Sequence, residues 1–412
     1  MSKKSLLIIG TVWVAPNASA AGSRMLQLIT VFQQQNFEIT FACAAKKVAP
    51  FFSLASLGIE EVEIQLNDAS FDDFVRKLNP EMILFDRFLT EEQFGWRVFE
   101  NCPNAMTILD TEDLHCLRKT REICLQKNKD FSIDELKQQD ITKREIASIL
   151  RCDVSLIIST FEMEILTSVF KVEAAILYYL PFLLNKIEVS QINKCLSFEE
   201  RNHFVFIGNF FHKPNVDAVQ TLKNHIWKNI RKQLPKAELH IYGAFVTAQI
   251  QQLHNPKEGF FIKGFAENAE EIITNAKIVL APLRFGAGIK GKLTEAMLCG
   301  TPSITTTIGA EGMHQNLPWN GFVTNDFEEF ANKAVELYTN QIVWESAQKN
   351  GIEIINAFYD KTKLEPTFIN RILEIQKDLE NHRSEHFLQS LLQYQTLQAT
   401  KYLSKWIEAK NQ

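Results

Sequence analysis

The sequence predicts an α/β protein with two doubly wound parallel-sheet domains that face each other across a cleft. Three observations carry this prediction. Short β-rich runs alternate with helix-period segments, the alternation stops and restarts near the middle of the chain, and the 412 residues exceed one ordinary domain. Alternation of this kind is typical of parallel sheets with helices on both faces. Ligands of such sheets bind at the carboxyl ends of the strands.

The first domain is expected at residues 1–190. Its strands are predicted at 5–9, 37–43, 61–65, 81–85, 106–109, 154–158 and 176–180. The first strand also fits the apolar core of a signal peptide, because basic residues precede it and small residues follow it. We favour the strand, because cleavage would remove the central strand of the sheet. Seven scattered cysteines also favour a reducing compartment, so we expect a cytoplasmic protein, with peripheral membrane contact left open.

Two segments break the pattern of the first half. Residues 119–150 are rich in Lys, Glu and Gln, and predict either a solvated helical pair or a lid, of which we favour the pair. Residues 183–202 lose the strand pattern and predict a linker to the second domain, expected at 191–358. The strands of this domain are predicted at 203–208, 238–242, 260–263, 278–281 and 303–307.

The segment 359–412 predicts terminal helices that end in an amphipathic tail at 381–412. The tail carries Phe387, Tyr402 and Trp406 among polar residues. Docking on the rest of the chain is the simplest interpretation. Pairing of two subunits and contact with a membrane surface stay open as alternatives.

Composition excludes several classes of protein. A net charge of −5 without a basic stripe disfavours a nucleic-acid partner, and no apolar run is long enough to span a bilayer. The histidines and cysteines lack zinc spacing, and no Gly-X-Ser-X-Gly motif indicates a hydrolase.

The most informative segment is 278–312. An apolar run predicts a buried strand, a basic glycine loop follows, and a helix then begins near Leu293. Glycines let backbone N–H groups approach an anion, and the start of a helix attracts negative charge. The segment therefore predicts a phosphate site, made of Gly286, Gly288, Ile289 and three cations, Arg284, Lys290 and Lys292. Glu295 lies one to two turns into the helix, where its carboxylate could accept both hydroxyls of a ribose. Diphosphate and ribose together indicate a nucleotide-sugar.

Residues 286–297, Gly-Ala-Gly-Ile-Lys-Gly-Lys-Leu-Thr-Glu-Ala-Met, and the Gly-Thr-Pro that follows at 300–302 resemble the donor site of the GT-B glycosyltransferases, specifically the retaining family GT4. The resemblance covers most of residues 3–360. It implies a GT-B fold and transfer of a hexose-type sugar from a nucleotide-diphosphate-sugar donor to an acceptor hydroxyl, with retention and without a cofactor. The acceptor would be a sugar, a lipid-linked molecule or another hydroxyl compound, in polysaccharide or glycoconjugate biosynthesis. The family usually carries two glutamates with seven residues between them; Glu295 matches the second, but Ala287 replaces the first.

The resemblance also assigns catalytic roles. His115, in the segment Asp110 to Arg118, would assist at the sugar, with Asp110 or Asp113 orienting it. A capped helix with solvated side chains is the alternative. Arg284 and Lys290 would stabilise the departing diphosphate. No Asp-X-Asp pair occurs, so we expect no metal.

Further donor-binding residues rest on weaker matches. Gly208 ends a strand, and Lys213 in the following loop would contact the donor phosphates or simply start a helix. Gly22 would let the acceptor and the diphosphate approach, whereas Arg24 would face either a phosphate or solvent. Glu311 could partly replace the missing first glutamate, although a surface turn is equally compatible. The alternative functions are a GT-B nucleotide-sugar epimerase and a non-catalytic sugar-nucleotide-binding descendant.

Overall fold

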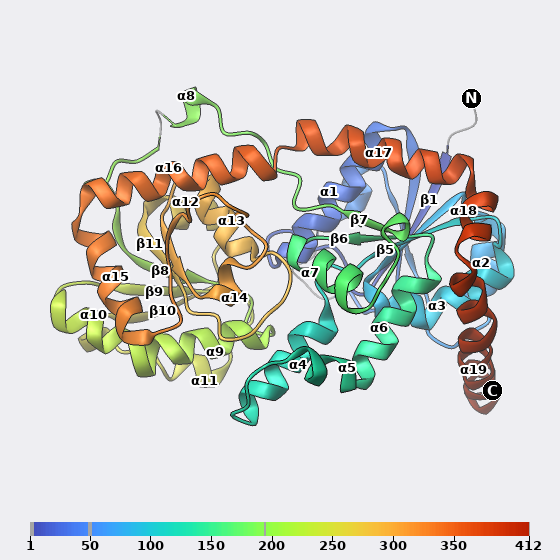
Figure 1. Cartoon of the computed structure of the whole chain (residues 1–412), viewed down its shortest axis with the longest axis horizontal. Helices are drawn as coiled ribbons and strands as arrows, with labels where there is room; N and C mark the ends of the chain where they lie inside the picture. Colours follow the sequence, from blue (N-terminus) through green and yellow to red (C-terminus); the bar gives the residue numbers. More distant parts are fainter. Residues whose placement is uncertain (1–3, 48–51, 193–194, 412) are drawn as a thin grey trace.

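Two parallel sheets organise the chain, one in each half (Figure 1). The computed structural model describes residues 4–47, 52–192 and 195–411. The first sheet has seven strands in the order β3-β2-β1-β4-β5-β6-β7, and the second has six in the order β10-β9-β8-β11-β12-β13. In both sheets the first strand of the domain is central, and the chain moves first to one side and then to the other. This topology confirms the predicted fold class of two doubly wound domains.

The first sheet contains all seven predicted strands, with small differences at their ends. The strands are β1 (Lys4–Gly10), β2 (Phe37–Cys43), β3 (Glu60–Glu63), β4 (Met82–Asp86), β5 (Met106–Asp110), β6 (Val154–Ile157) and β7 (Leu177–Tyr179). The helices of this half are α1 (Ala20–Gln34), α2 (Ser70–Leu78), α3 (Arg87–Asn101), α4 (His115–Gln126), α5 (Ile133–Gln138), α6 (Asp140–Arg151) and α7 (Thr160–Glu164). The apolar run Leu6–Ile9 is buried because β1 pairs with both β2 and β4. The strand interpretation of the amino terminus is therefore confirmed.

The second sheet contains the five predicted strands and one more. Its strands are β8 (Asn202–Ile207), β9 (Leu239–Tyr242), β10 (Phe260–Gly264), β11 (Ala276–Ala281), β12 (Ser303–Thr305) and β13 (Gly321–Val323). Its helices are α9 (Lys213–Thr221), α10 (Trp227–Gln233), α11 (Ala248–Gln251), α12 (Ala269–Asn275), α13 (Gly291–Leu298), α14 (Thr307–Ala310), α15 (Phe327–Thr339) and α16 (Gln341–Phe358). The strand β13 was not predicted, because three partly buried residues at a sheet edge carry too little periodicity.

The chain passes between the domains twice at the same place. After β7 it leaves through the linker that contains α8 (Val189–Ile192), and after α16 it returns as α17 (Lys361–Lys377) (Figure 1). The Leu184 N–H donates to the Tyr359 carbonyl, and the Lys361 N–H donates to the Leu184 carbonyl, both at 2.8 Å. Phe368 of α17 then packs edge-on against Phe32 of α1, at 5.8 Å between ring centroids. The two crossings thus form one backbone junction that joins the domains.

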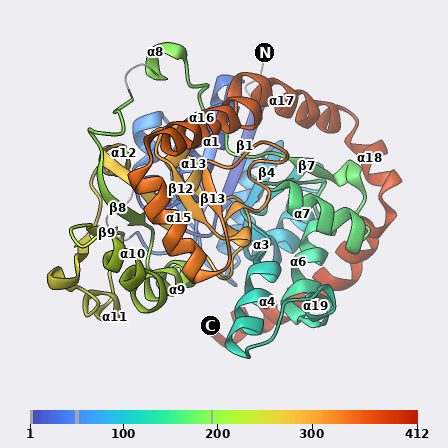
Figure 2. The same cartoon turned by 60° about the vertical axis from the view of Figure 1, so that its left-hand side comes forward.

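The tail consists of α18 (Leu379–Glu385) and α19 (Phe387–Asn411), and it docks on the first domain (Figure 2). The helix α19 lies against α3 and α6. Gln389 donates to the Arg151 carbonyl at 3.1 Å, and Arg97 donates to the Ser404 hydroxyl at 3.2 Å. Trp406 remains mostly exposed. Docking within the chain is therefore the interpretation that the structure supports. In the described ranges, no helix combines the length and apolar character that a membrane span requires.

Candidate active site

A cleft of about 1240 Å³ lies between the two domains, at the carboxyl ends of the central strands of both sheets. Thr11 follows β1 and Arg87 follows β4 on one wall, whereas Gly208 follows β8 and Gly243 follows β9 on the other. Several of the predicted donor-site residues line this cleft, namely Gly208, Gly286, Ile289, Lys290, Lys292 and Glu295. These residues therefore lie at the carboxyl ends of the strands, where ligands of such sheets are expected to bind.

Lys290 is a buried cation at the start of α13. It stands at the N-cap position of this helix, and its Nζ donates to the Gly288 carbonyl at 2.7 Å. Burial lowers the pKa of Lys290 to about 8, although the nearby charge of Glu311 opposes the shift. An anionic ligand would restore the charge of the ammonium group, because an opposite charge favours the protonated form.

Lys292 lies behind Gly208 and contacts the second wall of the cleft. Its Nζ donates to Asn215 Oδ1 at 2.6 Å and lies 4.1 Å from the centroid of the Phe206 ring. A Cβ on Gly208 would lie 2.7 Å from Asn215 Nδ2 and 2.9 Å from Lys292 Nζ. A side chain at residue 208 would thus displace the lysine, which explains the glycine. Burial lowers the pKa of Lys292 to about 7 and raises that of Glu295, which follows within a turn, to about 7.

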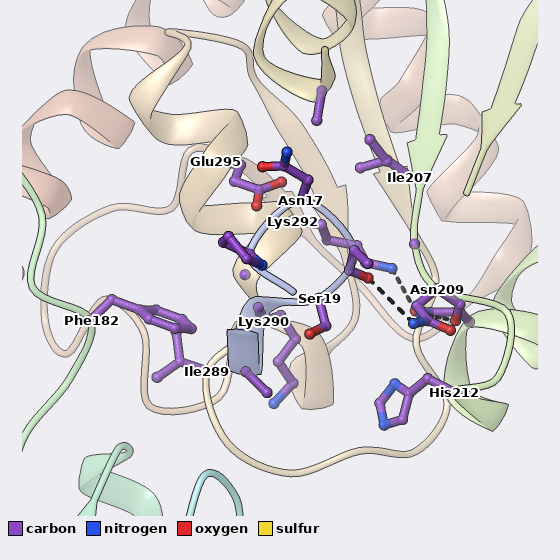
Figure 3. Close-up of a pocket in the computed structure, with 18 of the residues that line it drawn as sticks. Asn17, Ser19, Phe182, Ile207, Asn209, His212, Ile289, Lys290, Lys292 and Glu295 are labelled. Atoms are coloured by element: carbon purple, nitrogen blue, oxygen red, sulfur yellow. Dashed lines mark hydrogen bonds between the residues drawn. The ribbon is translucent and has the colours of Figure 1, made fainter. Parts of the chain in front are cut away.

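The amino-terminal ends of α1 and α13 meet across the cleft. A Cβ on Gly291, the first residue of α13, would lie only 2.6 Å from the Cβ of Ala20, the first residue of α1. Ser19 caps α1 by accepting the Gly22 N–H at 3.1 Å, and Figure 3 shows Ser19 next to Lys290. Two helix starts and a lysine thus converge on one point, which makes this end of the cleft attractive to anions.

Gly22 itself does not line the cleft, whereas its neighbours Ala20 and Ala21 do. A Cβ on Gly22 would lie 2.4 Å from the Ala15 carbonyl oxygen. The glycine therefore lets α1 start close to the preceding loop, and the approach of a ligand to Gly22 stays a prediction. Arg24 faces neither a phosphate nor solvent, because its guanidinium pairs with Asp110 at 2.9 Å in the core of the first domain.

His115 lines the cleft from the first domain, at the start of α4. Its Nε2 lies 3.2 Å from Asp113 Oδ1, and Arg118 donates to the same carboxylate at 2.7 Å. Burial favours protonated Asp113, but the charges of Arg118 and His115 outweigh it and lower the pKa of Asp113. Burial lowers the pKa of His115 to about 4, against the attraction of Asp113. The imidazole is thus neutral at pH 7, and Asp113, rather than Asp110, orients it.

His212 belongs to the same part of the cleft but comes from the second domain (Figure 3). Burial lowers its pKa to about 4, and the Arg118 guanidinium adds to the shift. His212 was not predicted as a site residue, because a histidine one residue before α9 carries no chemical pattern of its own. Arg87, Glu112 and Arg118, which line the first-domain wall, were not predicted as site residues either.

Three predicted residues bind partners outside the cleft lining. Arg284 forms an ion pair with Asp217 of α9, Lys213 pairs with Glu122 at 2.6 Å, and Glu311 pairs with Arg121 at 2.7 Å. The residues lining the cleft within the described ranges do not include Arg284, Lys213 or Glu311. The structure therefore does not bring Arg284 or Lys213 together with Lys290 and Glu295, whereas the charge of Glu311 acts on Lys290 from beside the cleft.

The glycine loop between β11 and α13 docks directly on the first domain. Arg121 of α4 donates to the Gly286 carbonyl, and the Gly288 N–H donates to Glu162 Oε1 of α7, each at 2.8 Å. Gly288 has φ +63°, and a Cβ there would lie 2.8 Å from the Cβ of Asp113. The start of the segment 119–150, which contains Arg121, thus contacts the second domain, and this part is not the solvated pair that we favoured. The charge pattern did not reveal this, because exposed and interfacial cations look alike in a sequence.

The part of the chain that the structure describes contains no group of three or more His, Cys, Asp or Glu side chains arranged to hold a metal ion. The cations and amides around Lys290 are the groups that could receive a charged ligand.

Comparison with known proteins supports the fold and the nature of the second domain. Residues 201–340 match the family model described as glycosyl transferases group 1. The structure is similar to a sucrose-phosphate synthase from Thermosynechococcus elongatus, with 16% identity, a TM-score of 0.67, and coverage of 90% of this chain and 99% of that chain. It is also similar to the pneumococcal O-GlcNAc transferase GtfA in complex with UDP and GlcNAc, with 11% identity, a TM-score of 0.67, and coverage of 91% and 99%.

A third similar structure is HepE of Anabaena in complex with UDP and glucose, with 12% identity, a TM-score of 0.63, and coverage of 89% of this chain and 98% of that chain. At these identities the likeness concerns the fold, which is the GT-B fold of glycosyltransferases. The predicted resemblance to GT-B glycosyltransferases is thereby confirmed. Among curated proteins, none matches the chain in sequence.

Proposed function

Because residues 201–340 match the group 1 glycosyltransferases in a chain with the GT-B fold, we propose that this protein transfers a sugar from a nucleotide-diphosphate-sugar to an acceptor hydroxyl. The observation that carries the proposal is the convergence of the α1 and α13 starts with Lys290 at one end of the interdomain cleft. A diphosphate leaving group needs such an arrangement, since positive groups aimed at the developing charge stabilise the transition state.

The remaining residues of the second-domain wall would bind the nucleoside. Glu295 lies on α13, near the proposed diphosphate position, and its carboxylate would accept the two hydroxyls of a ribose. Lys292 would support the charge from behind Gly208. Arg284 would join these groups only after exchanging its Asp217 partner for a phosphate. In the structures similar to this one, HepE and GtfA are complexes with UDP, which makes UDP-sugars the first donors to test.

His115 would act on the sugar from the opposite wall. Since the carboxylate of Asp113 only accepts hydrogen bonds, the Nε2 that faces it must carry the proton of the neutral ring. Asp113 therefore fixes the tautomer, and the other nitrogen, Nδ1, is left with a lone pair. We expect His115 to accept a hydrogen bond from a hydroxyl of the sugar or of the acceptor.

We further propose that transfer proceeds with retention and without a metal ion. Lys290 and the helix starts would neutralise the leaving diphosphate, and that diphosphate would take the proton of the acceptor hydroxyl. The anomeric configuration of the product, read by NMR, tests retention; an inverted product would refute it. Unchanged turnover in excess EDTA is the result expected for catalysis without a metal.

The acceptor is proposed to be a sugar, a lipid-linked molecule or another hydroxyl compound. Homodimer formation and membrane contact through α19 stay predictions.

The experiment that tests the function combines binding with turnover. The purified protein is mixed with UDP-, GDP-, ADP- and dTDP-sugars, and the shift in melting temperature is recorded for the wild type and for Glu295→Ala. One nucleotide class should stabilise the wild type and not the variant. Release of the matching nucleoside diphosphate, dependent on an added acceptor, would support transfer. A folded protein that none of these nucleotides stabilises would refute the proposal.

A further inference from the structure

Glu112 is an acidic residue in the wall of the cleft. It lies two residues after β5 and lines the first-domain wall. Its Oε1 atom is buried, and among the described residues nothing donates a hydrogen bond to it. A buried, unpaired polar atom costs free energy that folding does not recover, so such an atom in a cleft points to a missing ligand.

The backbone around Glu112 adds a second sign of function. Glu112 has φ +61°, and Arg87, at the end of the neighbouring strand β4, has φ +70°. Both values fall in the left-handed region, which is costly for residues with long side chains and is found at binding sites more often than elsewhere. The strands β4 and β5 pair in register up to Asp86 and Asp110, so the two strained residues follow adjacent strand ends. Both line the cleft.

Arg87 and Glu112 attract each other without touching. The charge of Arg87 acts on the Glu112 carboxyl, yet no ion pair within 4.0 Å joins them, and Arg87 instead contacts Asp86 at 3.4 Å. Burial and the charge of Asp110 raise the pKa of Glu112 well above its usual range, and Arg87 is held by Asp86, so in the described part of the chain the Glu112 carboxyl is left without a cation in contact. A hydroxylated ligand between them would accept from the guanidinium and donate to the carboxylate.

Glu112 also lies directly opposite the glycine loop. A Cβ on Gly288 would lie 3.4 Å from the Glu112 carbonyl oxygen. The loop itself offers no side-chain oxygen at this point, because residues 286–289 are Gly-Ala-Gly-Ile. A sugar attached to a diphosphate at the start of α13 would extend its hydroxyls toward the space between the loop and Glu112. Hydrogen-bond acceptors for these hydroxyls must come from the first domain, because the loop supplies no side-chain oxygen there.

We propose that Glu112, assisted by Arg87, binds the hydroxyl groups of the transferred sugar of the donor. This inference rests on the proposed function, since it needs a nucleotide-sugar in the cleft. It assigns recognition of the sugar to the first domain and recognition of the nucleotide to the second. Closure of the two domains would then be required to hold an intact donor.

The test compares ligands with and without the sugar. Titration calorimetry measures the Kd of UDP and of UDP-glucose, and of GDP and GDP-mannose, for the wild type, Glu112→Gln and Glu112→Ala. The ratio of the Kd of the nucleotide-sugar to that of the free nucleoside diphosphate should rise at least about tenfold in both variants, because the hydrogen bonds between the sugar hydroxyls and the Glu112 carboxyl are lost or weakened. The Kd of the free diphosphate should not change. Glu112→Asp, which keeps a shorter carboxylate, should recover part of the difference.

Two controls separate the possible failures. Glu92→Gln, which removes a partly buried carboxylate on α3 that pairs with Arg144 outside the cleft lining, should leave all four Kd values as they are. The melting temperature of Glu112→Gln should be equal to or above that of the wild type, because burial and Asp110 disfavour the charged carboxylate. A large drop would indicate a structural role and overturn the inference. The inference would also be overturned if the ratio of the two Kd values stayed the same in the variants while UDP or GDP still bound. A wild type that binds neither UDP nor GDP, nor ADP or dTDP, would overturn the proposed function, and this inference with it.

Discussion

Arg121 of α4 donates to both carboxylate oxygens of Glu311, at 2.9 and 2.7 Å, across the boundary between the two domains. The same guanidinium donates to the Gly286 carbonyl at 2.8 Å. One first-domain side chain therefore holds both the glycine loop and the turn after α14. The ion pair lies beside the cleft and not in it, so its effect on donor binding would act through the position of the loop.

Removal of the Arg121 contacts should weaken the association between the two domains. In Arg121→Met, Glu311 keeps a partly buried charge without its partner, which we expect to cost up to about 3 kcal/mol of unfolding free energy. The KM for the donor should rise more than kcat falls, because the loop is less often in place. Glu311→Gln is the matched variant, and the double variant should be less destabilised than the sum of the two. Additive effects in urea unfolding would show that the two residues do not act as a pair.

Lys290 is expected to contribute most to stabilising the leaving group. Lys290→Ala removes a buried cation next to two helix starts, so kcat should fall about 10²–10³-fold, the range seen when one oxyanion-stabilising group is lost. Lys333→Ala, on the exposed face of α15, is the control and should keep wild-type turnover. Turnover of Lys290→Ala near the wild-type level would remove this residue from the site.

The lowered pKa of Lys290 predicts how donor binding depends on pH. Burial brings this pKa down to about 8, so the ammonium is charged below this pH and neutral above it. Affinity for a nucleoside diphosphate should therefore fall as the pH rises through about 8, in addition to the change near pH 7 from Lys292 and Glu295. In Lys290→Arg the guanidinium stays charged throughout this range, and the part of the fall near pH 8 should disappear. Equal pH profiles for the two proteins, measured by titration calorimetry, would contradict this assignment.

Gly288 should be intolerant of a side chain for two separable reasons. Its φ of +63° strains any other residue, and a Cβ would meet the Cβ of Asp113 at 2.8 Å. Gly58 has φ +74° with open space around it, so Gly58→Ala isolates the strain alone, about 1 kcal/mol. Gly288→Ala should cost clearly more and should also weaken donor binding, because the loop can no longer dock on the first domain. Equal losses of stability in the two variants would mean that the close approach is not required.

Arg284 offers a test of a catalytic role that the family resemblance implies and the geometry does not support. Its guanidinium pairs with Asp217, and the residue is partly exposed. We expect Arg284→Ala to keep kcat within about threefold of the wild type, since exposed ion pairs contribute little. A loss comparable to that of Lys290→Ala would show that Arg284 leaves Asp217 when the donor binds.

Much of the architecture could be predicted because buried parallel strands are short apolar runs, and twelve of them stand out in this chain. The glycine loop could also be predicted from local sequence, since glycines and lysines occur there at close spacing before a helix. Lys290, Lys292 and Glu295 were found because they share one local motif. By contrast β13 is too short to show a period, and α4 looks like any solvated helix.

The residues of the first-domain wall could not be predicted as a group. Arg87 follows β4 and Glu112 follows β5, and the two share no motif, whereas His212 faces them from the loop after β8 in the second domain. Their proximity depends on how the strands are ordered and on how closely the domains approach.

The amino-acid sequence by itself determines the two sheets, the glycine loop and the positive start of α13, because these depend on local periodicity and on residues near each other in the chain. The tertiary structure decides the partner of each charge. It pairs Arg284 with Asp217 and Arg121 with Glu311, and among the described residues it leaves Glu112 Oε1 without a hydrogen-bond partner. The physical reason is that an ion pair needs two side chains within about 4 Å. Residues far apart in the sequence reach that distance only after the chain has folded and, for Arg121 and Glu311, after the two domains have docked.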